Sequence, residues 1–232
     1  MKNYIIVLFA LFFSCGIAYA QNPSEEDSGQ LPRNILSIGG GYGFISYLNW
    51  TKQNLSPWGK AYRQEMKGGM TFKAFYGRAL NKNQDKMLRG WGGLLEMVHA
   101  KGDYILKDSY IPIEDGVLLT YIAPQYFETY RYKHLLTGIR LGIGYMNYHN
   151  AGKKAGKSCV TKGNGGGINF ATQFTYLFGE HFGIGLELGL TAGFIGKLKQ
   201  KTDGEAIVTI QSKKSDLDAS HIDTMLHLNY YF

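Results

Sequence analysis

Alternation of apolar and polar residues is the strongest pattern in this chain, and it is cleanest from Phe182 to Ile195. One set of positions there carries bulky apolar side chains, and the positions between them carry mostly glycine: FGIGLELGLTAGFI. Successive side chains of an extended strand point to opposite faces, so this segment predicts a strand with one apolar and one polar face. Residues 221–232 alternate in the same way and end on the aromatic residue Phe232.

Six further segments show the same alternation less regularly, so the chain predicts eight strands. Pro124 cannot donate a hydrogen bond to a neighbouring strand, so a bulge or a strand end is expected there. The predicted strands are residues 34–47, 67–79, 90–99, 117–130, 134–148, 167–178, 182–195 and 221–232.

The connections between these strands alternate between long and mostly short. This rhythm, an even strand number and alternating strands are typical of bacterial outer-membrane barrels, whose long loops face outward. A strand of about eleven residues, at roughly 3.3 Å per residue and ~45° tilt, rises about 26 Å, which matches the apolar band of such barrels. The sequence therefore predicts an all-β fold, an eight-stranded antiparallel transmembrane β-barrel over residues 34–232.

The alternative barrel is a soluble one of the lipocalin type, which also has one apolar and one polar face. The expected inner face here is rich in glycine, serine and threonine, and an eight-stranded barrel is only just wide enough inside for side chains. A soluble barrel would expose the bulky Leu, Ile and Phe face to water as a continuous apolar belt. The pattern therefore favours the membrane barrel.

The start of the chain predicts a secretory signal peptide over residues 1–20. Lys2 is followed by the apolar run Tyr4 to Phe13 and by Ala18-Tyr19-Ala20, which has the small-x-small form of a cleavage site. A lipoprotein signal ending at Cys15 is the alternative. Residues 21–33 are polar and acidic and predict a flexible tether.

Cleavage would remove one lysine, so the formal charge of +7 would fall to +6, and about 210 residues would remain, enough for one domain. Cys159 would then be the single cysteine, so no internal disulfide is expected. A mean hydropathy of −0.20 is compatible with a barrel, because only alternate strand residues need be apolar.

Five charged residues fall on the expected inner face of the barrel. An unpaired buried charge costs several kcal/mol, so these side chains are expected to pair with one another and to plug the lumen. They are Lys73, Glu96, Arg140, Glu187 and Asp223.

This combination of strand pattern, glycine-rich inner face, inward charges and terminal Phe232 resembles the small outer-membrane barrels of the outer-membrane protein A and X type. The resemblance covers about residues 34–232 and implies an architecture, with no activity attached. It also implies that Phe232 serves as a signal to the barrel-insertion machinery. We expect the chain to be a monomer in the outer membrane of a Gram-negative cell.

Catalytic chemistry has little support in the sequence. Ser220, His221 and Asp223 form the single cluster of triad residue types, but neighbouring strand residues point to opposite faces. The segment Lys162 to Gly167 is rich in glycine, but it lacks the strand-loop-helix context of a phosphate-binding loop and is interpreted as a flexible loop. No catalytic residue, metal site, cofactor or nucleic-acid partner is assigned.

A basic outer loop is expected between the fifth and sixth strands. Its positive charge would attract the phosphates of lipopolysaccharide or an acidic surface partner. The expected function is that of a structural or surface-interaction protein acting through its outer loops. A lipid-modifying enzyme of the deacylase or phospholipase type and a narrow channel are the alternatives. The lysines of this loop are Lys153, Lys154, Lys157 and Lys162.

Overall fold

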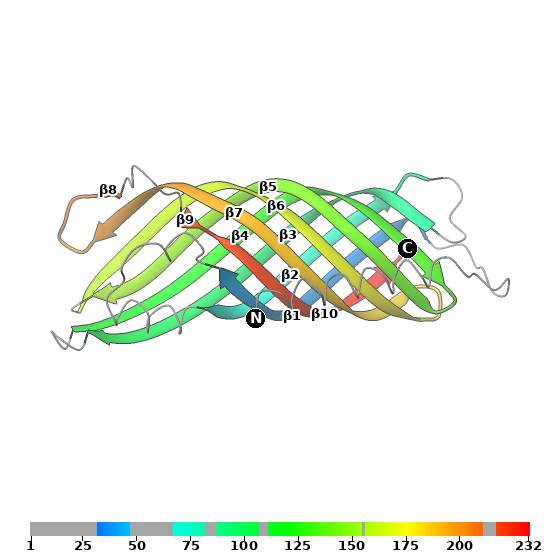
Figure 1. Cartoon of the computed structure of the whole chain (residues 1–232), viewed down its shortest axis with the longest axis horizontal. Helices are drawn as coiled ribbons and strands as arrows, with labels where there is room; N and C mark the ends of the chain where they lie inside the picture. The colour runs from blue at the N-terminus through cyan, green and yellow to red at the C-terminus, as the bar shows by residue number, and fades with distance from the viewer. Residues whose placement is uncertain (1–31, 47–66, 82–86, 107–110, 155, 211–216) are drawn as a thin grey trace.

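The computed structural model describes residues 32–46, 67–81, 87–106, 111–154, 156–210 and 217–232. The predicted signal peptide and nearly all of the predicted tether lie outside these residues. All regular elements of the described part are β-strands (Figure 1). They are β1 (Asn34–Ser46), β2 (Gly68–Ala79), β3 (Met87–Leu106), β4 (Ile111–Tyr132), β5 (Leu135–Lys154), β6 (Lys157–Phe178), β7 (Phe182–Thr202), β8 (Val208–Ile210), β9 (Leu217–Asp218) and β10 (Ser220–Tyr231).

Eight of these strands close into a ring. Each of the strands β1 to β7 pairs antiparallel with the next, and β10 closes the ring by pairing with both β7 and β1. The short strands β8 and β9 pair only with β7 and lie outside this ring. The predicted eight-stranded antiparallel barrel is therefore confirmed. The described residues contain no helix long and apolar enough to cross a membrane.

The barrel has two different ends, because its strands differ in length. At one end, here called the terminal end, β1 starts and β10 finishes, and the backbones of Asn34 and Phe232 exchange two hydrogen bonds. At the opposite loop end, the wall is uneven because β3 to β7 have 20 to 22 residues, whereas β1, β2 and β10 have 12 or 13. Strands β3 to β7 therefore extend as a sheet beyond β1, β2 and β10 (Figure 1).

This sheet extension corrects the prediction of a basic outer loop. Strand β5 continues to Lys154 and β6 starts at Lys157, and these two residues are partners in the ladder. Lys153 and Lys162 therefore also lie on strands, as does the glycine-rich segment that was expected to be a loop. The reason is that backbone hydrogen bonds hold this hairpin together, and they need no alternation of side chains.

Pro124 is also accommodated differently from the prediction. Strand β4 runs through it, and the register with β5 is the same at Ile122↔Tyr145 as at Gln125↔Gly142, so this ladder contains no bulge. No pairing with β5 is formed at residues 123 and 124, whereas Gly93 of β3 still pairs with Pro124. The missing N–H thus costs a local break in one ladder and leaves the strand intact.

The outer face of the barrel carries a belt of exposed apolar side chains. On β7 this belt runs from Phe182 to Phe194, which are 60% and 54% exposed. Twelve residue steps at roughly 3.3 Å and ~45° tilt give a height of about 28 Å, close to the apolar band of a transmembrane barrel. Aromatic rings cluster toward the terminal end, as interfacial girdles do; they include Tyr76, Trp91, Tyr130, Tyr176, Phe178, Phe182, Tyr230 and Phe232.

The lumen is filled in three layers. An apolar layer at the terminal end includes Ile35, Phe75, Leu88, Phe127, Leu136 and Leu177. A second apolar layer at the loop end includes Ile45, Val98, Val117, Leu119, Met146 and Ile195. Between them lies a polar layer that holds the buried charged side chains, and a second polar group of Thr175, His227 and Asn229 lies beside the terminal-end layer. The inner face is therefore less polar than the glycine-rich pattern indicated, because β2, β3, β4 and β5 supply bulky apolar residues.

Candidate functional site

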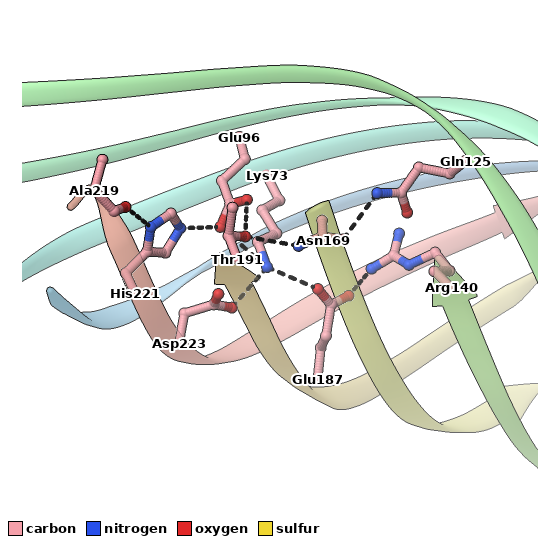
Figure 2. Close-up of polar contacts among 10 residues, drawn as sticks. All are labelled: Lys73, Glu96, Gln125, Arg140, Asn169, Glu187, Thr191, Ala219, His221 and Asp223. Carbon is pink, nitrogen blue, oxygen red and sulfur yellow. Dashed lines mark hydrogen bonds and ion pairs between the residues drawn. The ribbon is translucent and has the colours of Figure 1, made fainter. Parts of the chain in front are cut away.

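The centre of the polar layer is Lys73, which projects inward from β2 and is 3% exposed. Its ammonium nitrogen lies 2.7 Å from Asp223 Oδ1 on β10, 3.2 Å from Glu187 Oε1 on β7 and 3.2 Å from Glu96 Oε1 on β3. Glu96 is also the ladder partner of Lys73. An ammonium group has three hydrogen-bond donors, so three carboxylates satisfy it fully (Figure 2).

Arg140 on β5 is the second cation of the layer. Its guanidinium forms an ion pair with Glu187 Oε2 and lies over the ring of Phe75, 4.6 Å from the ring centroid. Glu187 therefore bridges the two cations, one through each carboxylate oxygen. A charge buried to this extent is tolerated only when it is paired and hydrogen-bonded.

A chain of neutral groups extends from the ion pairs across the barrel (Figure 2). Thr191 on β7 donates its hydroxyl to Glu96 Oε2 at 2.9 Å and accepts a hydrogen bond from Asn169 Nδ2 at 2.8 Å. The Asn169 side-chain oxygen in turn accepts from Gln125 Nε2 on β4, also at 2.8 Å. The network thus joins strands β2, β3, β4, β5, β6, β7 and β10 across the lumen.

His221 on β10 contacts acceptors with both of its ring nitrogens. Nε2 lies 2.9 Å from Glu96 Oε1, and Nδ1 lies 3.2 Å from the backbone oxygen of Ala219. The imidazole therefore links the ion-pair cluster to the backbone of β10.

Cation binding is the other chemistry that this cluster suggests. Glu96, His221 and Asp223 offer ligand atoms that lie within 4.8 Å of one another. Lys73 Nζ already contacts the carboxylates of both Glu96 and Asp223. The ammonium therefore takes the position that a metal ion would need.

Ser220 does not join His221 and Asp223. Its Oγ accepts a hydrogen bond from the backbone N–H of Gly193 at 3.1 Å, whereas His221 and Asp223 are buried in the lumen. Alternation thus separates Ser220 from His221 and Asp223, which share the inner face. The arrangement is one of paired, buried charges.

The structure brings together the five charged residues that the sequence places on the inner face. Sequence reasoning missed the network role of His221, Thr191, Asn169 and Gln125, although the alternation of β4, β6, β7 and β10 places all four inward. It also missed Lys197, Lys199 and Lys201, which lie on β7 beyond the predicted strand end at Ile195. The basic residues Lys153, Lys157 and Lys162 lie on the sheet extension, away from the lumen network.

Comparison with known proteins supports the fold. No protein-family model and no curated protein sequence matches the chain. Among solved structures, it is similar to a major outer membrane protein from Thermus thermophilus, with a TM-score of 0.51, 11% identity, and coverage of 86% of this chain and 99% of that one. It is equally similar to the outer membrane protein OprG from Pseudomonas aeruginosa, with a TM-score of 0.51, 15% identity, and coverage of 89% and 99%.

These neighbours are outer-membrane proteins, and the apolar belt of this barrel has the height that an outer membrane requires. The chain therefore has the fold of the small outer-membrane β-barrel proteins.

Proposed function

We propose that this protein is a closed outer-membrane barrel that acts as a structural or surface-interaction protein through the sheet extension and loops at its loop end. The observation that carries the proposal is the three-layer filling of the lumen. Lys73, Glu96, Arg140, Glu187 and Asp223 are each at most 3% exposed. Their charges are paired with one another, which is the arrangement of a plug and not of a hydrated path.

The sheet extension supports an interaction role because it is larger than a closed barrel needs. The lipid-facing belt on β7 ends at Phe194, yet the strand continues to Thr202. Beyond the membrane, the exposed side chains of these strands are available to other molecules. The connection from β1 to β2 and the one from β7 to β10 lie at the same end, and long connections of outer-membrane barrels face outward.

Cysteine labelling on intact cells tests this orientation. In a Cys159→Ser background, Ser158→Cys places one thiol on exposed β6 next to the loop-end hairpin, and Glu180→Cys places one in the exposed turn at the terminal end. We expect a membrane-impermeant maleimide to label the first variant on intact cells and the second only after the outer membrane is permeabilised. The reverse pattern, or recovery of both variants in the soluble periplasm, would contradict the proposal.

Conductance tests the closed lumen against the channel alternative. The purified, refolded chain is expected to give no discrete single-channel currents in a planar bilayer, because both apolar layers exclude hydrated ions. An Arg140→Met variant should be equally silent, since the apolar layers remain. Reproducible unitary currents that change with this substitution would favour the channel.

A further inference from the structure

The β6–β7 ladder contains an irregularity just beyond the lipid-facing belt. The register is Gly165↔Ile195 on one side of it and Gly163↔Leu198 on the other, so β7 has one extra residue there. Ile195 is buried, and Leu198 packs against the same apolar cluster. A bulge of this kind reverses which residues of a strand face inward.

As a consequence, Lys197, Lys199 and Lys201 project from the outer wall of the barrel. All three are exposed, whereas the residues between them are half-buried. Gln200, one of those between, reaches Cys159 Sγ on the inner side at 2.8 Å. Without the extra residue, simple alternation from Phe194 would turn the three lysines toward the lumen.

Lys162 of β6 completes this surface because it is the ladder partner of Lys199 and is also exposed. We call Lys162, Lys197, Lys199 and Lys201 the lysine face. In the part of the chain that the structure describes, no carboxylate forms an ion pair with any of the four, whereas Lys157 pairs with Glu205 at 3.6 Å. Like charges directly opposite each other on two strands destabilise the pair, so a bound anion would relieve a repulsion.

The distance of the lysine face above the lipid-facing belt restricts which molecules can reach it. Lys197 lies three residues beyond Phe194 and Lys201 seven, which corresponds to rises of roughly 7 Å and 16 Å above the belt at ~45° tilt. The polar headgroup region of a bilayer adds about 5 to 8 Å on each side of the hydrocarbon core. The lowest lysines therefore meet the headgroups, and the higher ones meet sugar attached to them.

We propose that the lysine face binds the phosphate groups of an anionic glycolipid in the surrounding leaflet, the chemical class of lipopolysaccharide. The apolar belt below it would hold the acyl chains of the same molecule, which a soluble acidic partner would not use. This inference rests on the proposed function, because it requires the loop end to face outward. The partner would bind on the outer side of β6 and β7, where the lysine face recognises its phosphates.

Native mass spectrometry of the refolded full chain in a non-ionic detergent tests the proposal, with bis-phosphorylated lipid A and its dephosphorylated form as probes. The test variant replaces all four lysines of the lysine face by glutamine. The control variant makes the same change at four other exposed lysines and so has the same net charge: Lys101, Lys133, Lys153 and Lys157. A heat-dependent shift on a denaturing gel verifies that each variant has folded.

We expect the wild type to prefer phosphorylated lipid A, and the lysine-face variant to bind it roughly tenfold more weakly or worse, since a lysine near an anionic surface contributes about 1 kcal/mol. The control variant should change by less than about threefold on the same scale. Raising salt should weaken wild-type binding because exposed charges are screened.

Equal losses in the two variants would overturn the proposal in favour of a net-charge effect. Equal affinity for dephosphorylated lipid A, or wild-type binding that is insensitive to salt, would overturn it as well, and neither result needs a variant to fold. The cysteine labelling above does not involve these lysines. It therefore reports separately on whether the loop end faces outward.

Discussion

We expect Glu187 and Arg140 to contribute to the free energy of unfolding as a coupled pair, which a double-mutant cycle measures. Glu187→Gln removes the carboxylate that pairs with the buried Arg140 guanidinium, so we expect a loss near 4 kcal/mol, within the range of about 3 to 5 for a broken buried pair. Arg140→Met leaves Glu187 in contact with Lys73 at 3.2 Å, so its cost should be nearer 3 kcal/mol.

The double variant removes both charges of the pair and leaves Lys73 with two carboxylates. Its cost should therefore fall below the sum of the single costs, about 7 kcal/mol, by a coupling energy of about 2 kcal/mol. The free energy of unfolding is measured by urea titration in phospholipid vesicles, followed by tryptophan fluorescence. Trp91, which is 58% exposed on the outer face, reports on transfer into the lipid.

A matched cycle on an exposed pair provides the control. Arg89 and Glu128 are 2.7 Å apart at the terminal end, and the Arg89 side chain is 49% exposed. Solvent screens such a pair, so Arg89→Met and Glu128→Gln should be close to additive. If the Glu187 and Arg140 changes were additive within about 0.5 kcal/mol, the ion pair would not stabilise the lumen as argued.

Two further substitutions test the two faces of β7. Leu188→Arg, at the middle of the lipid-facing belt, should lower the free energy of unfolding in vesicles by about 2 to 4 kcal/mol; an unchanged urea midpoint would mean that this face does not contact lipid. Gly189→Ala should cost about 1 to 3 kcal/mol by overpacking, because a Cβ there would collide with Lys73 Nζ and with the Asp223 carboxylate. Gly40→Ala is the control, since its nearest neighbour would be Thr71 O at 3.9 Å, and equal effects would remove the steric argument.

Alternation predicts the strands well where one face meets lipid and the other meets the lumen. It fails on the sheet extension because both sides of β5 and β6 meet water there, so nothing selects apolar residues at every second position of residues 149–166. The bulge after Ile195 could not be predicted either. The alternation of apolar and polar positions changes phase between Ile195 and Leu198, and in a sequence such a change looks like the end of a strand.

The pattern of a single strand predicts which of its side chains face the lumen, but it does not predict which of these side chains form ion pairs. Lys73 and Glu187 are 114 residues apart, and Lys73 and Asp223 are 150 apart. Which inner residues meet depends on the stagger of all eight strands around the ring. The same reason explains why Phe75 and Leu94 were not recognised as core residues, since their space is defined by strands on the opposite wall.

The seam between β1 and β10 separates this barrel from a simple series of hairpins. Strands β2 to β7 each pair with the preceding strand, so these contacts form between near neighbours in the chain. The seam joins the first and last strands through twelve residue pairs, from Ile35↔Tyr231 to Ser46↔Ser220. Because lipid cannot hydrogen-bond an open strand edge, an incomplete chain would have no stable place in the membrane. The ring therefore cannot close until β10 has been made, so the carboxyl-terminal strand completes the barrel for the whole chain.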